Sequence, residues 1–322
     1  MNCALDSVSG VQVPSSVQIG RGNLISPPAM SAASTPTLFK DLAVLFKLRL
    51  GTFVVLSAVL GWFMGKESIG LIPFLELTVG GYLLTGASNG FNQILEKDAD
   101  SKMERTAGRP LPTGRMSVRN AILWSTSAGI LGLAALFNLG TRAGLLGLVA
   151  IGSYVLAYTP LKSRSGFSVL VGAIPGAIPP MLGYVAATGQ FGIEPGTLFA
   201  VQFMWQFPHF WAIAWVLHDD YLKAGYRLLP FKEGRTAASA RQILFYTMLC
   251  IPASLLPWAL PGEAPMVGNI AFLVAIFSGF AFLVPAIRLW RGLEVKDARQ
   301  LMFASFLYLP IVQLTYVLDK IP

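Results

Sequence analysis

The chain has 322 residues, of which 54% are hydrophobic and only 12% are charged. A soluble domain has roughly 45–50% apolar and about 25% charged residues, so a soluble fold of this length would lack the polar side chains to cover its surface. The formal net charge of +8 does not indicate nucleic-acid binding, because the Lys and Arg residues lie in short loops between apolar segments. The composition predicts a polytopic helical membrane protein with no nucleic-acid partner.

The first 40 residues are rich in Ser, Thr, Pro and Gly and contain no apolar run long enough for a signal peptide. We expect a disordered tail over residues 1–40 and a single transmembrane domain over residues 41–322. Mitochondrial transit peptides are rich in Arg, whereas this tail contains only Arg21 and Lys40 as basic residues. The tail therefore favours a bacterial inner membrane over a mitochondrial one.

Apolar runs recur along the rest of the chain, each close to the roughly 20 residues that cross the hydrocarbon core of a bilayer. They predict an all-α fold with nine transmembrane helices. The runs lie at about residues 42–65, 70–95, 120–139, 142–161, 167–188, 196–218, 241–260, 267–289 and 299–318.

Basic residues are unevenly divided between the two sides of such a bundle. With nine spans, the loops of one side hold all of the 24 Lys and Arg residues except Lys66, Arg142 and Lys320. Loops rich in Lys and Arg remain in the cytoplasm, so we expect the N-terminus in the cytoplasm and the C-terminus outside.

A charged loop begins in the second predicted span and reads NQILEKDADSKMERTAGRP over residues 92–110. Asn92, Glu96 and Asp100 are four residues apart and so share one stripe of a helix, whereas Asp98 points elsewhere. Carboxylates at this spacing repel each other, and Mg²⁺ is the natural counter-ion because it prefers oxygen ligands and leaves positions for substrate phosphates. The stripe therefore indicates a Mg²⁺–diphosphate site. The alternative is a solvated, salt-bridged helix end.

Other polar residues are expected at the same membrane face. Arg105 and Arg109 have the spacing to bind phosphate oxygens in bidentate fashion. Asp219 and Asp220 follow the sixth predicted span and provide carboxylates for a second metal ion opposite the first. His209 lies inside that span, where a polar side chain normally lines a cavity, so we predict a substrate pocket there rather than a packing role.

The segment between these loops adds cations and a bent helix. The turn YTPLKSR at residues 158–164 brings Lys162 and Arg164 to the same face. The following span contains Pro175, Pro179 and Pro180, which free backbone carbonyls that lipid cannot satisfy. We therefore expect this helix to bend and to border a cavity.

Together these motifs resemble the haem O synthase (protohaem IX farnesyltransferase) family of UbiA-type intramembrane prenyltransferases. The segments WQFPH at 205–209 and DYLKAG at 220–225 indicate the haem branch. The resemblance implies a bundle of nine helices around a central cavity, with Mg²⁺ and diphosphate at its cytoplasmic mouth. It also implies transfer of the farnesyl group of farnesyl diphosphate to a vinyl group of haem B, which gives haem O, with haem A synthase as a candidate acceptor of the product.

The resemblance also implies roles for single residues. The implied metal or diphosphate ligands are Asn92, Glu96, Asp98, Asp100, Asp219 and Asp220. The implied diphosphate or substrate contacts are Arg105, Arg109, Lys162, Arg164, Tyr158, Asp220 and His209, the last of which would face the haem.

This sequence departs from the superfamily pattern at two places. Glu96 stands where Asp is usual, and no carboxylate follows Asp219 or Asp220 after four residues. The number of metal ions therefore stays open: the site could hold one ion, or a second ion bound mainly by diphosphate.

Two other functions are compatible with these sequence features. One is a prenyltransferase of the same architecture that acts on a quinone precursor or another aromatic acceptor. The other is a secondary transporter, which kinked helices and polar groups within the membrane would fit. Transporters usually have internal repeats and binding sites near the middle of the membrane, whereas the acidic residues here gather at one face, so the sequence favours an enzyme.

Overall fold

The computed structural model describes residues 38–259 and 265–321, which lie in one compact unit. The regular elements in these residues are helices, apart from an isolated bridge between Val267 and Lys320. The predicted tail lies outside the described residues except for residues 38–40, which begin α1. The helices are α1 (Leu38–Leu45), α2 (Leu48–Gly65), α3 (Leu71–Leu95), α4 (Lys97–Asp100), α5 (Val118–Leu139), α6 (Thr141–Gly152), the π-helix η1 (Ser153–Tyr158), α7 (Thr159–Leu161), α8 (Ser168–Thr188), α9 (Ile193–Val216), α10 (His218–Lys223), α11 (Ala237–Ala259), α12 (Asn269–Gly292) and α13 (Val295–Leu318).

The helices of membrane-spanning length follow the predicted spans. In the described residues, eight helical segments are long and apolar enough to cross a membrane, one of them formed jointly by α6, η1 and α7. The remaining predicted span corresponds to α9, which has 24 residues but carries Gln202, Gln206 and His209. These eight segments and α9 confirm the predicted all-helical fold, with ends that differ from the predicted ones by a few residues.

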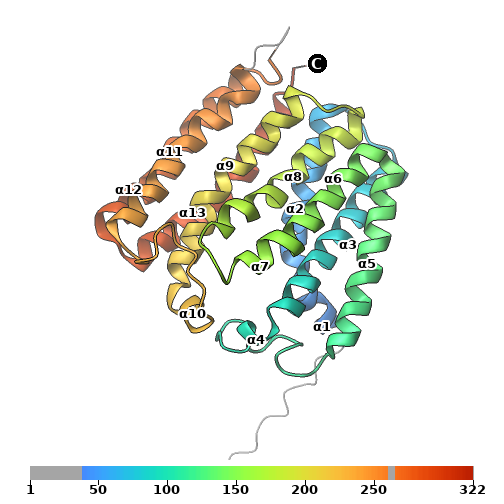
Figure 1. Ribbon diagram of the computed structural model, residues 1–322. Helices are drawn as coiled ribbons and strands as arrows, with labels where there is room; N and C mark the ends of the chain where they lie inside the picture. The colour runs from blue at the N-terminus through green and yellow to red at the C-terminus, as the bar shows by residue number, and fades with distance from the viewer. Residues whose placement is uncertain (1–37, 260–264, 322) are drawn as a thin grey trace, which may run out of the picture. The chain divides into compact units, whose positions relative to one another are not determined.

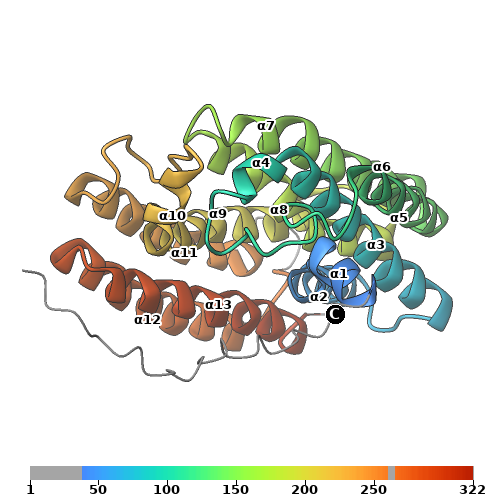
Figure 2. The ribbon, with the colours of Figure 1, turned by 90° about the horizontal axis from the view of Figure 1, so that it is seen from below.

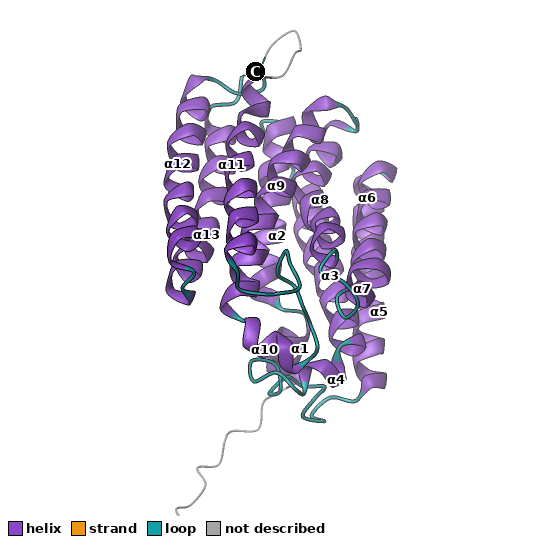
Figure 3. Cartoon of the chain, turned by 60° about the vertical axis from the view of Figure 1, so that its left-hand side comes forward, coloured by secondary structure: helices purple, strands orange, loops and turns teal. Residues whose placement is uncertain are grey.

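The first predicted span differs most, because the chain breaks between α1 and α2. Lys47 has a φ of 48° and ψ of 53°, a left-handed conformation that interrupts the helix. For a residue other than glycine this conformation costs about 1–2 kcal/mol. The prediction of one helix from residue 42 onwards was therefore wrong. The separate helix α1 lies at the end of the bundle where α4 and α10 lie (Figures 1 and 3).

Close helix packing organises the inner part of the bundle. The helix α2 packs against α3, α8 and α13, and α9 packs against α8, α11 and α13 (Figure 2). The backbones of α2 and α8 nearly touch: a Cβ atom on Gly183 would lie 1.8 Å from the carbonyl oxygen of Ala58, and one on Gly61 would lie 2.0 Å from that of Pro180. Small residues permit such an approach, which is the usual way in which helices associate in a bilayer.

Glutamine side chains satisfy the backbone carbonyls of the proline-rich helix α8. Pro180 has no N–H to donate to the carbonyl of Gly176, and Gln202 Nε2 donates to that carbonyl instead, at 2.6 Å. Gln206 Nε2 likewise donates to the carbonyl of Ala173, at 2.9 Å. The expectation that the freed carbonyls find protein partners in place of lipid is confirmed at Gly176.

Candidate active site

A largely apolar cavity of about 290 Å³ lies within the bundle. Its wall is formed by α2, α3, η1, α8, α9 and α13, and includes Tyr158 and His209. The lining residues Phe53 on α2 and Phe306 on α13 are 53% and 40% exposed, so the cavity reaches the outer surface of the bundle beside these two helices. The prediction that the proline-rich helix borders a cavity is confirmed, because Pro175 and Pro179 of α8 line it.

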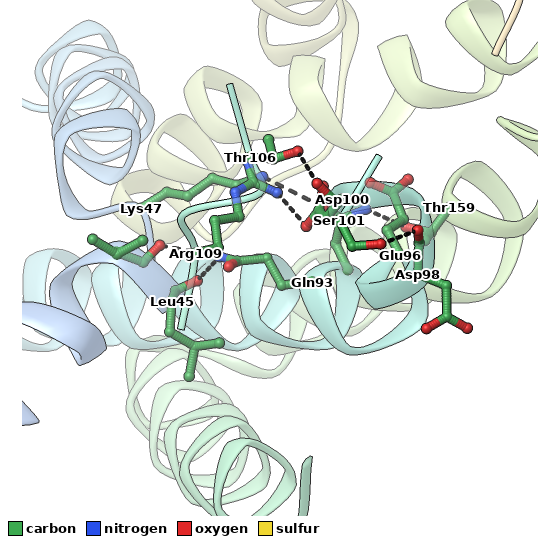
Figure 4. Close-up of polar contacts among 12 residues, drawn as sticks. Leu45, Lys47, Gln93, Glu96, Asp98, Asp100, Ser101, Thr106, Arg109 and Thr159 are labelled. Atoms are coloured by element: carbon green, nitrogen blue, oxygen red, sulfur yellow. Dashed lines mark hydrogen bonds and ion pairs between the residues drawn. The ribbon is translucent and has the colours of Figure 1, made fainter. Parts of the chain in front are cut away.

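Six polar side chains converge next to this cavity, and we call them the charged cluster: Lys47, Asn92, Glu96, Asp100, Arg109 and Lys162. The cluster adjoins the cavity at Tyr158, which lines the cavity and whose carbonyl accepts from the backbone N–H of Lys162 at 3.1 Å. Its members come from the break before α2, the end of α3, α4 and the loops that follow α4 and α7, and Figure 4 shows most of them. Lys162 donates from Nζ to Glu96 Oε2 at 3.2 Å, and Arg109 donates from NH1 to Asp100 Oδ2 at 2.6 Å. Lys47 Nζ lies 3.4 Å from Asn92 Oδ1.

The helical register of the predicted stripe is preserved through the end of α3. The backbone N–H of Glu96 donates to the carbonyl of Asn92 at 2.9 Å, and that of Asp100 donates to the carbonyl of Glu96 at 2.7 Å. All three side chains are buried, with exposed fractions of 2%, 4% and 0% for Asn92, Glu96 and Asp100. The alternative of a solvated helix end is therefore wrong for these three residues.

Each buried carboxylate has one oxygen paired with a cation and one without a partner. Glu96 Oε1 and Asp100 Oδ1 are inaccessible to solvent and have no hydrogen-bond partner among the described residues. Burial of an unpartnered charged oxygen is costly, so these two atoms fit a site for a hard cation with oxygen ligands. No group of three His, Cys, Asp or Glu side chains gathers in the described part of the chain, so a metal ion here would need further ligands from substrate or water.

The cations of the cluster repel one another. Burial, together with the nearby charges of Arg109 and Lys162, outweighs the carboxylates and lowers the pKa of Lys47 to about 7. For Lys162, burial acts to lower the pKa, but the Glu96 carboxylate and neighbouring tyrosines outweigh burial and the pKa is raised. Arg109 and Lys162 thus balance the two carboxylates, while Lys47 is only partly protonated near neutral pH. A polyanionic ligand beside Lys47 would favour its protonated form and so add positive charge to the cluster.

Asp220 holds the first charged loop in place. Its Oδ1 and Oδ2 accept from the backbone N–H groups of Glu104 and Arg105, at 2.8 and 3.3 Å. Burial acts to raise the pKa of Asp220, but these two N–H donors and the nearby Lys223 outweigh it and the pKa is lowered. In this structure Asp220 therefore fixes the backbone of the first charged loop at Glu104 and Arg105.

Tyr221 of α10 and Tyr226, which follows that helix, cover Lys162. Its Nζ lies 4.9 Å from the ring centre of Tyr226 and 5.9 Å from that of Tyr221. Arg105 is exposed, and its guanidinium carbon lies 5.9 Å from the ring centre of Tyr221. The two tyrosine rings orient Lys162 by cation–π attraction.

Other residues named from the sequence lie outside the charged cluster. Asp219 is 74% exposed in its side chain and pairs with Arg235 at 2.9 Å, so it does not face Glu96 and Asp100. Asp98 is exposed and points away from the other two carboxylates (Figure 4). Arg164 is exposed and has no ion pair within the described part of the chain. The expectation of a second acidic pair facing the first is not met, because Asp219 and Asp220 bind Arg235 and the loop backbone, respectively.

Sequence reasoning missed Lys47, Thr159 and the two tyrosines. Lys47 was interpreted only as a topology signal, although a lysine within a predicted span was the available clue. Thr159 accepts from Asn92 Nδ2 at 3.3 Å and so links the end of α3 to α7. Nothing in the sequence pattern pointed to the contacts of Tyr221 and Tyr226 with Lys162.

The sequence pattern of the UbiA prenyltransferase family matches residues 50–309. The chain belongs to the UbiA prenyltransferase family. It is accordingly an integral membrane protein and a prenyltransferase. This UbiA-family chain is 46% identical over 288 residues to the protoheme IX farnesyltransferase of Christiangramia forsetii, which covers 88% of this chain and 94% of that protein.

Solved structures share the fold at low sequence identity. A digeranylgeranylglyceryl phosphate synthase superposes with a TM-score of 0.71 at 18% identity, over 87% of this chain and 98% of that one. A UbiA homologue from Archaeoglobus fulgidus bound to GPP and Mg²⁺ superposes with a TM-score of 0.65 at 15% identity, over 86% of this chain and 99% of that one. Both likenesses support the predicted UbiA-type bundle.

Proposed function

We propose that this UbiA-family chain transfers the farnesyl group of farnesyl diphosphate to a vinyl group of haem B, which gives haem O and releases diphosphate. The observation that carries the proposal is the position of a buried charged cluster beside an apolar cavity. The charged cluster suits a diphosphate, and the apolar cavity suits a prenyl chain and a flat apolar acceptor. The 46% identity to a protoheme IX farnesyltransferase supports haem B as that acceptor.

The charged cluster would act on the leaving diphosphate. Lys47, Arg109 and Lys162 would bind its oxygens and neutralise the charge that develops as the bond from farnesyl C1 to oxygen breaks. Asn92, Glu96 and Asp100 would hold Mg²⁺, and the unpartnered oxygens Glu96 Oε1 and Asp100 Oδ1 are the observation that supports this role. Mg²⁺, when bound, supplies further neutralisation of the leaving group.

The cavity would protect the farnesyl cation until it meets the acceptor. Its apolar wall keeps water from the allylic carbon, which would otherwise be captured as an alcohol. The terminal vinyl carbon of haem B bonds to farnesyl C1, and the resulting cation beside the porphyrin ring takes a hydroxyl from water as a proton leaves. The haem gains one farnesyl and one hydroxyl group, and diphosphate departs.

The opening beside α2 and α13 gives haem a route from the bilayer. Phe53 and Phe306 stand at this opening and offer an aromatic surface to an apolar porphyrin. We further propose a bacterial inner membrane, with the charged cluster at the cytoplasmic side and haem A synthase as the enzyme that receives the product. The distribution of Lys and Arg between loops supports this orientation.

A comparison of acceptors tests the function. The purified protein is supplied with farnesyl diphosphate, Mg²⁺ and either haem B or a phenolic acid, and the products are separated and weighed by mass spectrometry. We expect farnesylated haem and no farnesylated phenol. Transfer to the phenol alone would favour an enzyme of quinone synthesis.

A further inference from the structure

His209 is fixed in the wall of the cavity by aromatic neighbours. Its ring stacks on that of Trp205, with centroids 4.4 Å apart and planes 15° apart. The ring of Phe306 is nearly perpendicular to that of His209, with planes 77° apart and centroids 4.9 Å apart, and Phe306 itself stands at the opening beside α13. His209 is 7% exposed, so its ring has a defined plane and a defined place in the cavity wall.

The hydrogen bonds of Ser305 determine which ring nitrogen carries the proton. Ser305 Oγ donates to the carbonyl of Met302 at 2.5 Å and lies 2.8 Å from His209 Nδ1. A hydroxyl group has a single hydrogen, so Ser305 accepts from His209 and Nδ1 bears the proton. In neutral imidazole the other nitrogen, Nε2, then has a free lone pair, and Nε2 has no hydrogen-bond partner among the described residues.

Ser305 is itself held firmly, because its backbone carbonyl accepts from Trp205 Nε1 at 2.8 Å. The indole that stacks on His209 therefore also anchors the residue that orients it. A histidine whose Nδ1–H is held by an oxygen atom is the arrangement that metal-ligating histidines adopt. Haem iron in particular is commonly held by a single histidine.

We infer that His209 Nε2 is an axial ligand of the haem iron when haem B occupies the cavity, and that Ser305 is the positioning residue for this ligand. The inference rests on the proposed function, because it assumes haem B as the acceptor. Ligation would fix the porphyrin in the cavity and so determine which edge of it faces the farnesyl cation. His209 would thus position the acceptor and would take no part in bond formation.

The test uses isotope labelling, which needs no change at His209. The full-length protein is reconstituted in lipid nanodiscs with ferrous haem B and nitric oxide, once with natural histidine and once with ¹⁵N-histidine. An axial imidazole opposite the nitric oxide splits its electron paramagnetic resonance signal, and the ¹⁵N label should change that splitting. The chain has two histidines, so His218→Ala is the matched control: His218 lies in α10, does not line the cavity, and its loss should leave the label effect intact.

Two variants examine the same ligand from the protein side. His209→Ala should abolish the histidine splitting, and added imidazole should restore an axial nitrogen signal. Ser305→Ala should weaken haem binding by roughly 10- to 100-fold, as loss of such a supporting hydrogen bond does at other metal sites.

Product formation, measured on the same samples, separates this inference from the proposed function. If the wild-type protein farnesylates haem but shows no effect of the label, or if His209→Ala keeps the histidine splitting, the iron-ligand inference is overturned and the function stands. If the wild-type protein neither binds nor farnesylates haem, both are overturned. A folded His209→Ala variant that loses turnover with an unchanged haem spectrum would assign the lone pair to proton transfer and overturn the iron ligand.

Discussion

Asp100 combines complete burial with an unsatisfied oxygen, and its replacement tests the role of the charged cluster. In Asp100→Asn the size and shape of the side chain remain, while the charge that would bind the metal is lost. We expect kcat/KM for farnesyl diphosphate to fall by about 10²-fold or more, because charge stabilisation of a leaving group is usually worth that much. Initial rates of diphosphate release at several Mg²⁺ concentrations measure this.

The matched control is Asp219→Asn. Asp219 lies in the other charged loop and pairs with Arg235 on an exposed surface, so the same chemical change there should leave turnover within about twofold of the wild type. The amount of monodisperse protein recovered in detergent shows whether either variant is misfolded. Equal loss of activity at both positions would contradict the assignment of the cluster.

Lys47 offers a test of the residue that the sequence pattern missed. Its left-handed backbone and its contact with Asn92 place a cation among the carboxylates and arginine of the cluster. Lys47→Met should raise KM for farnesyl diphosphate by about 10- to 100-fold, the effect of one lost charge-assisted hydrogen bond, whereas Lys47→Arg should retain most of the affinity. Steady-state kinetics on the two variants decide this, and an unchanged KM in Lys47→Met would remove Lys47 from the diphosphate site.

The grouping of site residues could be predicted from the sequence where they follow the helical repeat along one helix. Asn92, Glu96 and Asp100 could be grouped because backbone hydrogen bonds carry the helical spacing from α3 into α4. The pairing of Glu96 with Lys162 could not be predicted, because 66 residues separate them and only tertiary packing brings them together. Asp219 was misassigned because a carboxylate near a span end looks the same in sequence whether it faces the cluster or solvent.

At the scale of the helices, the contact between α2 and α8 defines one wall of the cavity. A methyl group on Gly183 would overlap the carbonyl oxygen of Ala58, so Gly183→Ala should force the two helices apart. We expect a loss of about 1–3 kcal/mol in the free energy of unfolding, as overpacking usually produces, and a lower melting temperature in detergent.

The control for that variant is Gly196→Ala. Gly196 lies in α9, and a Cβ atom there would have no neighbour within 4 Å. The exchange should be neutral or slightly stabilising, because alanine favours a helix over glycine by about 1 kcal/mol. Equal melting temperatures for Gly183→Ala and the wild type would show that the two helices are not held as closely as the structure indicates.

The helices themselves were largely predictable, and their exceptions have physical causes. Long apolar runs must form helices in a bilayer, because every backbone group needs a partner within the chain. The break at Lys47 escaped prediction because neither glycine nor proline marks it. We expected protein groups to satisfy the freed carbonyls of α8, but the sequence did not indicate which ones. Gln202 and Gln206 come from α9, and only tertiary packing brings them to α8.

For the whole molecule, the arrangement of polar and apolar regions links fold to reaction. In the proposed reaction, the charged cluster binds the leaving diphosphate and the apolar cavity shields the farnesyl cation from water. The opening beside α2 and α13 admits haem B from the bilayer. These regions are contributed by helices from the first to the last of the bundle. We therefore expect one active site that needs the complete set of helices.

In the proposed reaction, the charged cluster with Mg²⁺ and the adjoining cavity together transfer farnesyl to haem B. The most direct measurement incubates purified full-length protein in lipid with haem B and farnesyl diphosphate, with Mg²⁺ or with EDTA, and weighs the haem products by mass spectrometry. We predict haem bearing one added farnesyl and one hydroxyl group with Mg²⁺, and unchanged haem B with EDTA or in Asp100→Asn. Unmodified haem B in the presence of Mg²⁺, or farnesylated haem formed equally well in EDTA, would overturn the proposed Mg²⁺-dependent reaction.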